Sequence, residues 1–296
     1  MTPRRLAAVA GALVLLTAPG CRRGTGAPAA GNGDPLAESR ALVDDRRYDE
    51  AIARLGTGSD PESLYLLGRA WAGKAEAAPV PTPAPGAPAT AGAPLKPEEE
   101  QALAFFERAV AARPDHAAAH LAIAQLLAPH ALASVARGGA PAAGGATVDR
   151  VLRSFGEAVQ ADPGGTAAAE AMVQFATRAG RVADADAAFQ ELLRRRREDP
   201  DLLVRYGDFL AGPGGNGEGA LAQYAQALIW RPDDAATKRK MADIQLVAVA
   251  ALLSRQQYAT AEARLHDARK FVTNPASPEA ARLRELEGRL AEIRGR

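Results

Sequence analysis

The chain has 296 residues, of which 47% are hydrophobic, 24% charged and only 5% aromatic. Alanine is abundant, whereas β-branched and aromatic residues are too sparse for an extensive sheet, so the composition indicates a helical protein. The 36 basic and 35 acidic residues give a net charge of +1, which excludes the strongly basic surface of a dedicated nucleic-acid binder. The single cysteine, Cys21, excludes an intramolecular disulfide framework and a cysteine-based zinc site.

Residues 1–20 have the pattern of an export signal. Two arginines precede an apolar run over residues 6–16, which is too short to span a bilayer but suits a signal-peptide core. Small residues then lead directly to Cys21. The segment resembles a bacterial lipoprotein signal, in which a peptidase cuts before a cysteine that carries the lipid, although Ala18 stands where that family usually has Leu. The alternative is an ordinary secretory signal followed by an incidental cysteine.

The lipoprotein resemblance implies attachment to a membrane through Cys21. Cleavage would remove two arginines and change the net charge from +1 to −1, so acyl chains and not bulk charge would hold the mature protein there. Arg22 follows the cysteine where Asp would be the familiar inner-membrane signal, so the resemblance favours the outer membrane, facing the periplasm. Residues 21–34 are rich in Gly, Pro and Ala and are expected to form a flexible tether.

The rest of the chain repeats one pattern. A small residue is followed four positions later by a bulky apolar residue, three positions after that by a small or apolar residue, and then by Pro. These steps place the side chains on one helical face, and Pro separates that helix from the next. The five copies are Ala102, Phe106, Ala109 and Pro114; Val151, Phe155, Ala158 and Pro163; Ala185, Phe189, Leu192 and Pro200; Ala220, Tyr224, Ala227 and Pro232; and Ala261, Leu265, Ala268 and Pro275.

This repeated pattern resembles the tetratricopeptide (TPR) family. In that family each repeat is an antiparallel pair of helices, A and B, and small residues let the two helices approach closely. Leu67-Gly68 and Tyr206-Gly207 fit the A-helix pattern. The resemblance implies an all-α fold, a right-handed α-solenoid of about five to six TPR-like helix pairs over residues 35–275, with about thirteen helices in all.

The repeats are interrupted by inserted material. Residues 78–97 contain seven prolines and are expected to form a polyproline-like or disordered loop between the A and B helices of one repeat. A second segment, 129–146, is Gly- and Ala-rich and similarly placed. The spacing also predicts a lengthened helix at about 233–254. An amphipathic stretch within 276–296 resembles the capping helix that closes such an array.

Possible reactive groups are few. His116 and His120 stand four residues apart and could share a metal, but Ala117 replaces the Glu of a zinc-protease signature, so two surface histidines are the favoured interpretation. The run 194–197 is four arginines at a predicted helix end, where a solvated terminus is favoured over an anion site. The Gly-rich segment 212–219 lacks the Lys-Ser/Thr ending of a phosphate-binding loop and is expected to be a turn. We expect no catalytic residue, no bound metal, no cofactor and no enzymatic activity.

Aromatic residues are expected to serve the core. Phe106, Phe155, Phe189 and Tyr224 occupy the bulky position of the repeat. The two tryptophans, Trp71 and Trp230, are interpreted as core or half-exposed residues and not as ligand contacts.

The expected function is therefore protein binding. In TPR arrays the A helices line a groove for a peptide or a partner's helix, and mapping that face onto this chain gives a mixed-charge set. The set is Glu62, Tyr65, Arg69, Gln125, Glu170, Gln174, Arg178, Asp208, Arg239 and Asp243. We predict a scaffold that helps to assemble a cell-envelope complex, such as a pilus, a secretin, or the outer-membrane or cell-wall machinery. The alternatives are a metal-dependent factor using His116 and His120, and a soluble secreted binding protein.

Overall fold

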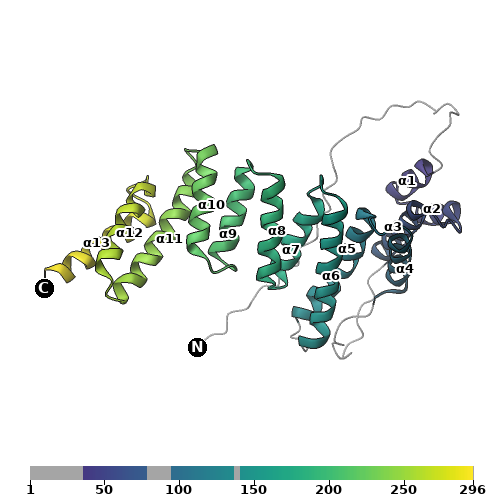
Figure 1. Ribbon diagram of the computed structural model, residues 1–296, viewed down its shortest axis with the longest axis horizontal. Helices are drawn as coiled ribbons and strands as arrows, with labels where there is room; N and C mark the ends of the chain where they lie inside the picture. The colour runs from purple at the N-terminus through teal and green to yellow at the C-terminus, as the bar shows by residue number, and fades with distance from the viewer. Residues whose placement is uncertain (1–35, 79–94, 137–140, 296) are drawn as a thin grey trace. The chain divides into compact units, whose positions relative to one another are not determined.

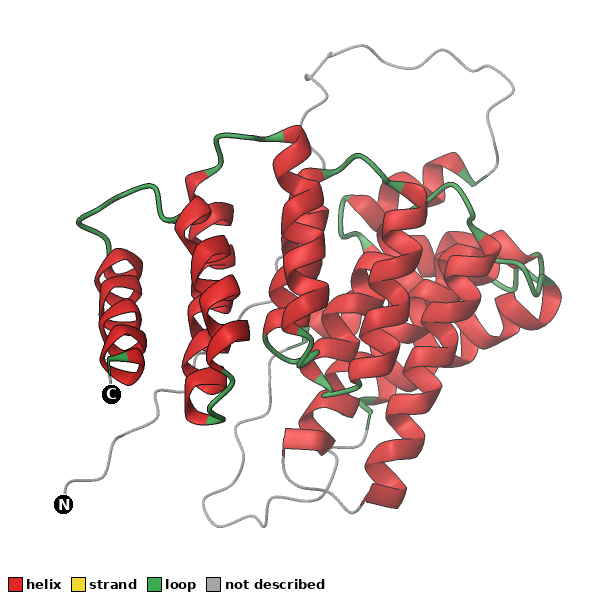
Figure 2. Ribbon diagram, turned by 60° about the vertical axis from the view of Figure 1, so that its left-hand side comes forward, coloured by secondary structure: helices red, strands yellow, loops and turns green. Residues whose placement is uncertain are grey.

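The computed structural model describes residues 36–78, 95–136 and 141–295. Every regular element in these ranges is an α-helix, as Figure 2 shows, and there are thirteen of them. They are α1 (Ala37–Asp44), α2 (Tyr48–Leu55), α3 (Pro61–Ala77), α4 (Pro97–Ala112), α5 (Ala117–Ala136), α6 (Pro141–Ala161), α7 (Ala167–Arg178), α8 (Val182–Arg195), α9 (Pro200–Ala211), α10 (Gly217–Trp230), α11 (Ala235–Ser254), α12 (Tyr258–Phe271) and α13 (Pro278–Arg294).

The helices form six consecutive pairs followed by α13 (Figure 1). The pairs are α1–α2, α3–α4, α5–α6, α7–α8, α9–α10 and α11–α12, and each also contacts the next along the chain. The expected all-α solenoid of TPR-like pairs with a C-terminal capping helix is therefore confirmed. Odd-numbered helices up to α11 are the A helices, and their even-numbered partners are the B helices.

Close pairing of the helices depends on small residues opposite bulky ones. A Cβ atom added to Gly68 of α3 would lie 2.5 Å from the ring of Phe106 on α4. A Cβ on Gly207 of α9 would lie 2.4 Å from the ring of Tyr224 on α10. Such distances are far inside van der Waals contact, so only glycine fits at these two positions. The four predicted core aromatics are all buried, which confirms their assignment.

Polar residues and prolines define where several helices begin. The carboxylates of Asp60 and Asp199 accept backbone N–H bonds in the first turns of α3 and α9, and each is followed by Pro at the first helical position. The Ser277 hydroxyl does the same at the start of α13. A side-chain acceptor and a proline with fixed φ both favour a helix start, and these three steps begin helices. Asp162-Pro163 does not, because α7 begins only at Ala167; there the proline separates two helices.

The buried side chains fall into several clusters. The largest extends from α4 to the first half of α11 and includes a group of rings formed by Phe189, Tyr206 and Phe209, with Phe189 5.1 Å from Tyr206 between centroids. A separate cluster joins the second half of α11 to α12 and α13. Helix α11 therefore belongs to two cores, through Met241 in the first and Leu246 in the second.

The two insertions differ in structure. The first leaves α3 after Ala77 and returns at α4, and its residues 79–94 lie outside the described ranges. The second is mostly helical, because α5 continues through Pro129 to Ala136 and α6 begins at Pro141. The expectation that 129–146 lies between the two helices of its repeat is therefore wrong for most of the segment. The extra residues instead lengthen both helices of one pair.

Two further predictions concern the C-terminal part. The lengthened helix expected at 233–254 is α11, and the expected capping helix is α13. Leu283, Leu286 and Leu290 of α13 are buried, whereas the opposite side of the helix carries exposed Arg and Glu residues. A polar outer face is what a terminal cap requires, because no further repeat covers it.

Helix α5 is unusually apolar. Within the described residues it is the one helix long and apolar enough to cross a membrane by length and composition. It packs against α4, α6 and α7 in the array, and its buried residues, Ile123, Ala124 and Leu127, belong to the largest core cluster. A third of its apolar stretch, 33%, is buried by these contacts.

Candidate partner-binding surface

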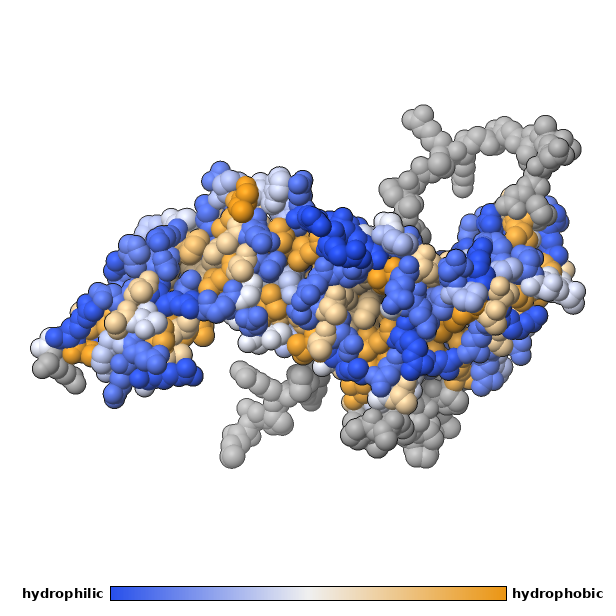
Figure 3. All heavy atoms as spheres, viewed as in Figure 1, coloured by the Kyte–Doolittle hydropathy of each residue, from blue (hydrophilic) through white to orange (hydrophobic). Residues whose placement is uncertain are grey.

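The ten residues predicted to contact a partner all lie on A helices. Three are on α3, one on α5, three on α7, one on α9 and two on α11. Figure 3 shows one face of the molecule, on which hydrophilic surface predominates and apolar patches are scattered between polar ones. Such a surface offers many separate side-chain contacts.

Half of the predicted set is engaged within the protein. Glu62 accepts from the Arg40 and Arg113 guanidinium groups at 3.2 and 3.3 Å. The other four intramolecular pairs are Arg69 with Asp44 at 2.9 Å, Glu170 with Arg196 at 3.0 Å, Asp208 with Lys240 at 2.7 Å, and Arg239 with Glu279 at 3.5 Å. These pairs connect different helices, so the charged members of the set also hold the array together.

Four members of the set are exposed and make no ion pair or side-chain hydrogen bond to a described residue. They are Gln125, Gln174, Arg178 and, on α11, Asp243. Tyr65 is different, because its ring is half-buried against Phe106 and His116, with centroids 6.0 and 5.1 Å away. Burial raises the pKa of Tyr65, so its hydroxyl stays protonated and can donate a hydrogen bond.

Asp208 forms the centre of a small polar cluster between α9, α10 and α11. The Tyr224 hydroxyl donates to its carboxylate at 2.7 Å, and the Lys240 ammonium donates to both carboxylate oxygens, also at 2.7 Å. The Lys240 ammonium lies 5.9 Å from the Tyr224 ring centre. Burial and the Asp208 carboxylate raise the pKa of Tyr224. The cluster fixes an exposed negative group at a defined place on α9.

The last member of the set, Asp243, lies on α11 one turn from Arg239. Partial burial raises the pKa of its carboxyl, and the nearby negative charge of Glu279 on α13 raises it further. One turn further along α11, Val247 is 55% exposed. The exposed side of α11 thus presents a cation, a carboxyl and an aliphatic side chain in sequence.

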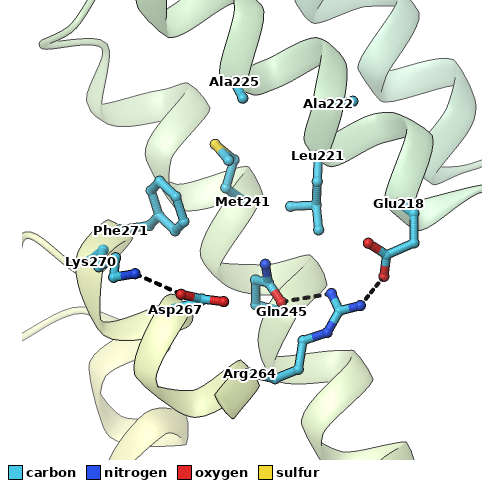
Figure 4. Close-up of a pocket in the computed structure, with 10 residues that line it drawn as sticks. All are labelled: Glu218, Leu221, Ala222, Ala225, Met241, Gln245, Arg264, Asp267, Lys270 and Phe271. Carbon is cyan, nitrogen blue, oxygen red and sulfur yellow. Dashed lines mark hydrogen bonds and ion pairs between the residues drawn. The ribbon is translucent and has the colours of Figure 1, made fainter. Parts of the chain in front are cut away.

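A hollow of about 580 Å³ lies between α10, α11 and α12 (Figure 4). Its apolar part is formed by Leu221, Met241 and Phe271, and two small residues of α10 keep it open. At its polar end, Arg264 bonds Gln245 at 2.9 Å and also pairs with Glu218. None of the ten predicted residues lines this hollow: α11 contributes Met241 and Gln245 to it, whereas the mapping chose Arg239 and Asp243 on that helix.

A second hollow lies beside the four-arginine run, at the turn from α8 to α9. Arg195 is largely buried there and donates to the carbonyls of Val159 and Asp162 at the end of α6, both at 2.9 Å. Arg196 pairs with Glu170 of α7. The expectation of a merely solvated helix end is thus wrong for Arg195, which caps the C-terminus of α6.

Glu191 supports the same turn. It accepts from Arg194 and from Arg195, at 2.7 Å each. These hydrogen bonds, the one from Arg194 above all, lower the pKa of Glu191 from 4.5 to about 2. The arginine run is therefore partly neutralised by acidic neighbours, which leaves little attraction for an external anion.

His116 and His120 are buried, so the expectation of surface histidines is wrong. They are 5% and 4% exposed. The His120 Nε2–H donates to the Pro114 carbonyl at 2.7 Å, and its Nδ1 lies 3.0 Å from a carboxylate oxygen of Glu157. In the part of the chain that the structure describes, no three His, Cys, Asp or Glu residues are placed to hold a metal ion. Each histidine is instead packed between helices.

Cys21, the predicted lipid-attachment residue, lies outside the described residues, as do the signal peptide over 1–20 and the tether over 21–34. Their assignment therefore stays a prediction from the sequence.

The helix pairs and their small-against-bulky packing define a TPR-type α-solenoid. Solved structures with similar architecture include TTC0263, a TPR protein of Thermus thermophilus, which is 19% identical with a TM-score of 0.39 and covers 71% of this chain and 96% of its own. MamA of Desulfovibrio magneticus RS-1 is 16% identical with a TM-score of 0.42 and covers 69% of this chain and 99% of its own. YrrB, a TPR protein described as having an unusual peptide-binding site, is 14% identical with a TM-score of 0.42 and covers 80% of this chain and 97% of its own.

No protein-family profile matches the chain, and no curated protein matches it. The class of fold is therefore set by the chain's own helix pairs, which form an all-α array of TPR-like architecture over the described residues.

Proposed function

We propose that this protein is a lipid-anchored, non-enzymatic scaffold that binds a protein of the bacterial cell envelope through its A helices. The observation that carries the proposal is that Gln125, Gln174 and Arg178 are exposed on two A helices, α5 and α7, which contact each other. The packing of the repeats does not require these side chains, so they are available for a partner. The lipoprotein-like sequence around Cys21 supports an envelope location.

The partner contact can be tested by site-specific photocrosslinking in cells. A photoreactive residue is introduced at Gln125 or at Gln174, on A helices, and crosslinked products are identified by mass spectrometry. Gln160 and Gln226 are exposed glutamines on the B helices α6 and α10 and provide matched controls. We expect a shared envelope protein from both A-helix positions and not from the controls. Equal crosslinking at all four positions would contradict binding through the A helices.

A second experiment tests whether Gln125 and Gln174 are needed for partner binding. Gln125→Arg and Gln174→Arg add bulk and charge at exposed positions, so the fold is expected to be retained, with a stability change within about 0.5 kcal/mol. We expect loss of the partner on co-purification with an unchanged melting temperature. Retention of the partner by the double variant would overturn the assignment.

The anchor is tested separately by labelling cells with an alkynyl fatty acid. We expect the wild-type protein to be labelled and recovered with outer membranes, and the Cys21→Ala variant to be unlabelled and released. Equal labelling of both proteins would overturn attachment at Cys21. Recovery of an unlabelled wild type in the culture supernatant would instead support the soluble secreted alternative.

A further inference from the structure

His116 lies at the junction between two helix pairs. It directly precedes α5, and its 5% exposed ring packs 5.1 Å from the ring of Tyr65 on α3. The hydrophobic cluster beside it is small and consists of Leu64, Ala109 and Ala119, with partly buried neighbours. The largest cluster also crosses this junction, through Phe106 and Ile123, so the polar contacts of His116 act beside an apolar core.

One hydrogen bond of the His116 ring favours its neutral form. The backbone N–H of Ala119 bonds the His116 carbonyl at 3.0 Å and also reaches Nδ1 at 3.4 Å, and Nδ1 can accept this second bond only while it carries no proton. The proton of the neutral ring is therefore on Nε2, which lies 3.6 Å from a carboxylate oxygen of Glu62. Protonation of Nδ1 would turn this acceptor into a donor facing another donor.

The surroundings also disfavour a charged ring. Burial lowers the pKa of His116, the positive charge of Arg113 lowers it further, and the Glu62 carboxylate acts in the opposite direction. Glu62 is shared, because it also accepts from Arg113 and from Arg40, which leaves less of its charge to compensate a histidinium.

The remaining ionisable groups at this place belong to α5, α6 and α3. His120 follows one turn later, and its positive charge would also oppose that of His116. The Glu157 carboxylate on α6 faces His120. On α3, the Tyr65 hydroxyl stays protonated because burial raises its pKa. None of these groups provides His116 with a carboxylate of its own.

We propose that the junction between the α3–α4 and α5–α6 pairs is an acid-sensitive joint, which loosens when His116 takes up a proton. The sign follows from linkage: the unfolded or opened form takes up a proton near pH 6.5, and the closed form does so only at lower pH. Stability of the joint is complete above about pH 6.5 and is lost as the pH falls below it. Tyr65 and Glu62, which touch His116, belong to the predicted partner surface, so acid would change that surface at its α3 end.

The protonation of His116 can be measured directly by NMR on the full chain. The protein has four histidines, and exposed His266 serves as an internal reference. We expect the His116 ring to remain neutral, with its proton on Nε2, at a pH where His266 is half protonated. A His116 ring that titrates together with His266 would overturn the proposal.

The loosening of the junction at low pH is tested by amide hydrogen exchange, with each rate corrected for the pH dependence of the intrinsic exchange rate. In the wild type, protection of the first turn of α5 is expected to fall by up to about tenfold per pH unit below pH 6.5. His116→Asn keeps a side-chain acceptor before the helix but cannot be charged, so its protection is expected to be independent of pH over the same range. His266→Asn is the matched control and is expected to behave as the wild type. Identical acid profiles for wild type and His116→Asn would overturn the proposal.

Discussion

Helices α5 and α11 occupy equivalent places in the array but present different surfaces. Both are A helices of 20 residues. Helix α5 contains no Asp, Glu, Lys or Arg, and its exposed side includes Gln125. Helix α11 carries charged residues in its first half, including Arg239 and Asp243, and none in its second half. The difference shows that the repeat fold constrains the packed side of a helix and leaves the composition of its exposed side free to vary.

The two helices also differ in the core beneath them. Leu127 of α5 belongs to the largest cluster, which extends over many helices, whereas Leu246 of α11 belongs to a smaller one shared with α12 and α13. The C-terminal end of the array is therefore expected to unfold more independently than the middle.

The largest expected effect on stability comes from truncating one buried leucine in each of the two cores. Leu246→Ala and Leu127→Ala each remove a buried side chain and are expected to cost about 2–5 kcal/mol of unfolding free energy. In urea with hydrogen exchange as the readout, the loss of protection for Leu246→Ala is expected to concentrate in α11–α13. For Leu127→Ala the loss of protection should extend over α4–α10. An equally wide loss of protection in both variants would contradict the independence of the C-terminal core.

A smaller effect tests whether close helix pairing requires glycine opposite a bulky ring. Gly207→Ala places a methyl group against the Tyr224 ring and is expected to destabilise by about 1–3 kcal/mol. The control is Gly156 of α6, where an added Cβ meets nothing within 4 Å. Gly156→Ala is expected to stabilise by about 0.5–1 kcal/mol, because Ala is the better helix former. Thermal unfolding measures both changes, and the same sign for the two variants would argue against the rule.

Exposed positions on the two helices are expected to contribute unequally. Lys240→Ala on α11 removes the partner of Asp208 and should cost no more than about 1 kcal/mol, since the pair is solvent-exposed. Gln125→Ala on α5 removes no side-chain hydrogen bond and should leave stability within about 0.5 kcal/mol. Chemical denaturation at low and high salt distinguishes them, because the cost of Lys240→Ala should shrink as salt screens its pair with Asp208, whereas that of Gln125→Ala should not change.

The smallest effect concerns pH. The pKa of Asp243 is raised in the folded protein, so the folded form binds a proton more readily than the unfolded form and the ionised carboxyl opposes folding at neutral pH. Asp243→Asn is expected to stabilise the protein by a few tenths of a kcal/mol at pH 7. The gain should shrink as the pH falls and Asp243 becomes protonated in the wild type. A gain that is constant from pH 7 to pH 3 would exclude this cause.

Much of the fold follows from local sequence. The Asp-Pro steps and the recurring small and bulky positions are short-range signals, and they predicted the helix pairs, the long helix α11 and the cap α13. The segment 129–146 was misassigned because Pro and Gly usually interrupt helices. Tertiary packing overrode this tendency around Pro129, since Leu127 and Ala131 on either side of it are buried.

The candidate surface was less predictable. The sequence places Glu62 and Asp208 on A helices, but their engagement with Arg113 and Lys240 depends on residues 51 and 32 positions away. The burial of His116 has the same origin, because Tyr65 and Glu62 reach it from the preceding pair. No local pattern encodes such contacts, and the hollow between α10 and α12 involves B helices that the TPR resemblance did not mark.

Arg195 has a consequence for how the array responds to force or to a bound partner. Arg195 belongs to α8, and its guanidinium donates hydrogen bonds to carbonyl groups at the C-terminal end of α6. It therefore joins the α7–α8 pair to the α5–α6 pair. If α8 moved, the carbonyl groups at the end of α6 would lose their hydrogen bonds to Arg195. These bonds could form again only if α8 returned to its original position. The Arg195 side chain thereby adds a polar link between two adjacent pairs that already pack through α6 and α7.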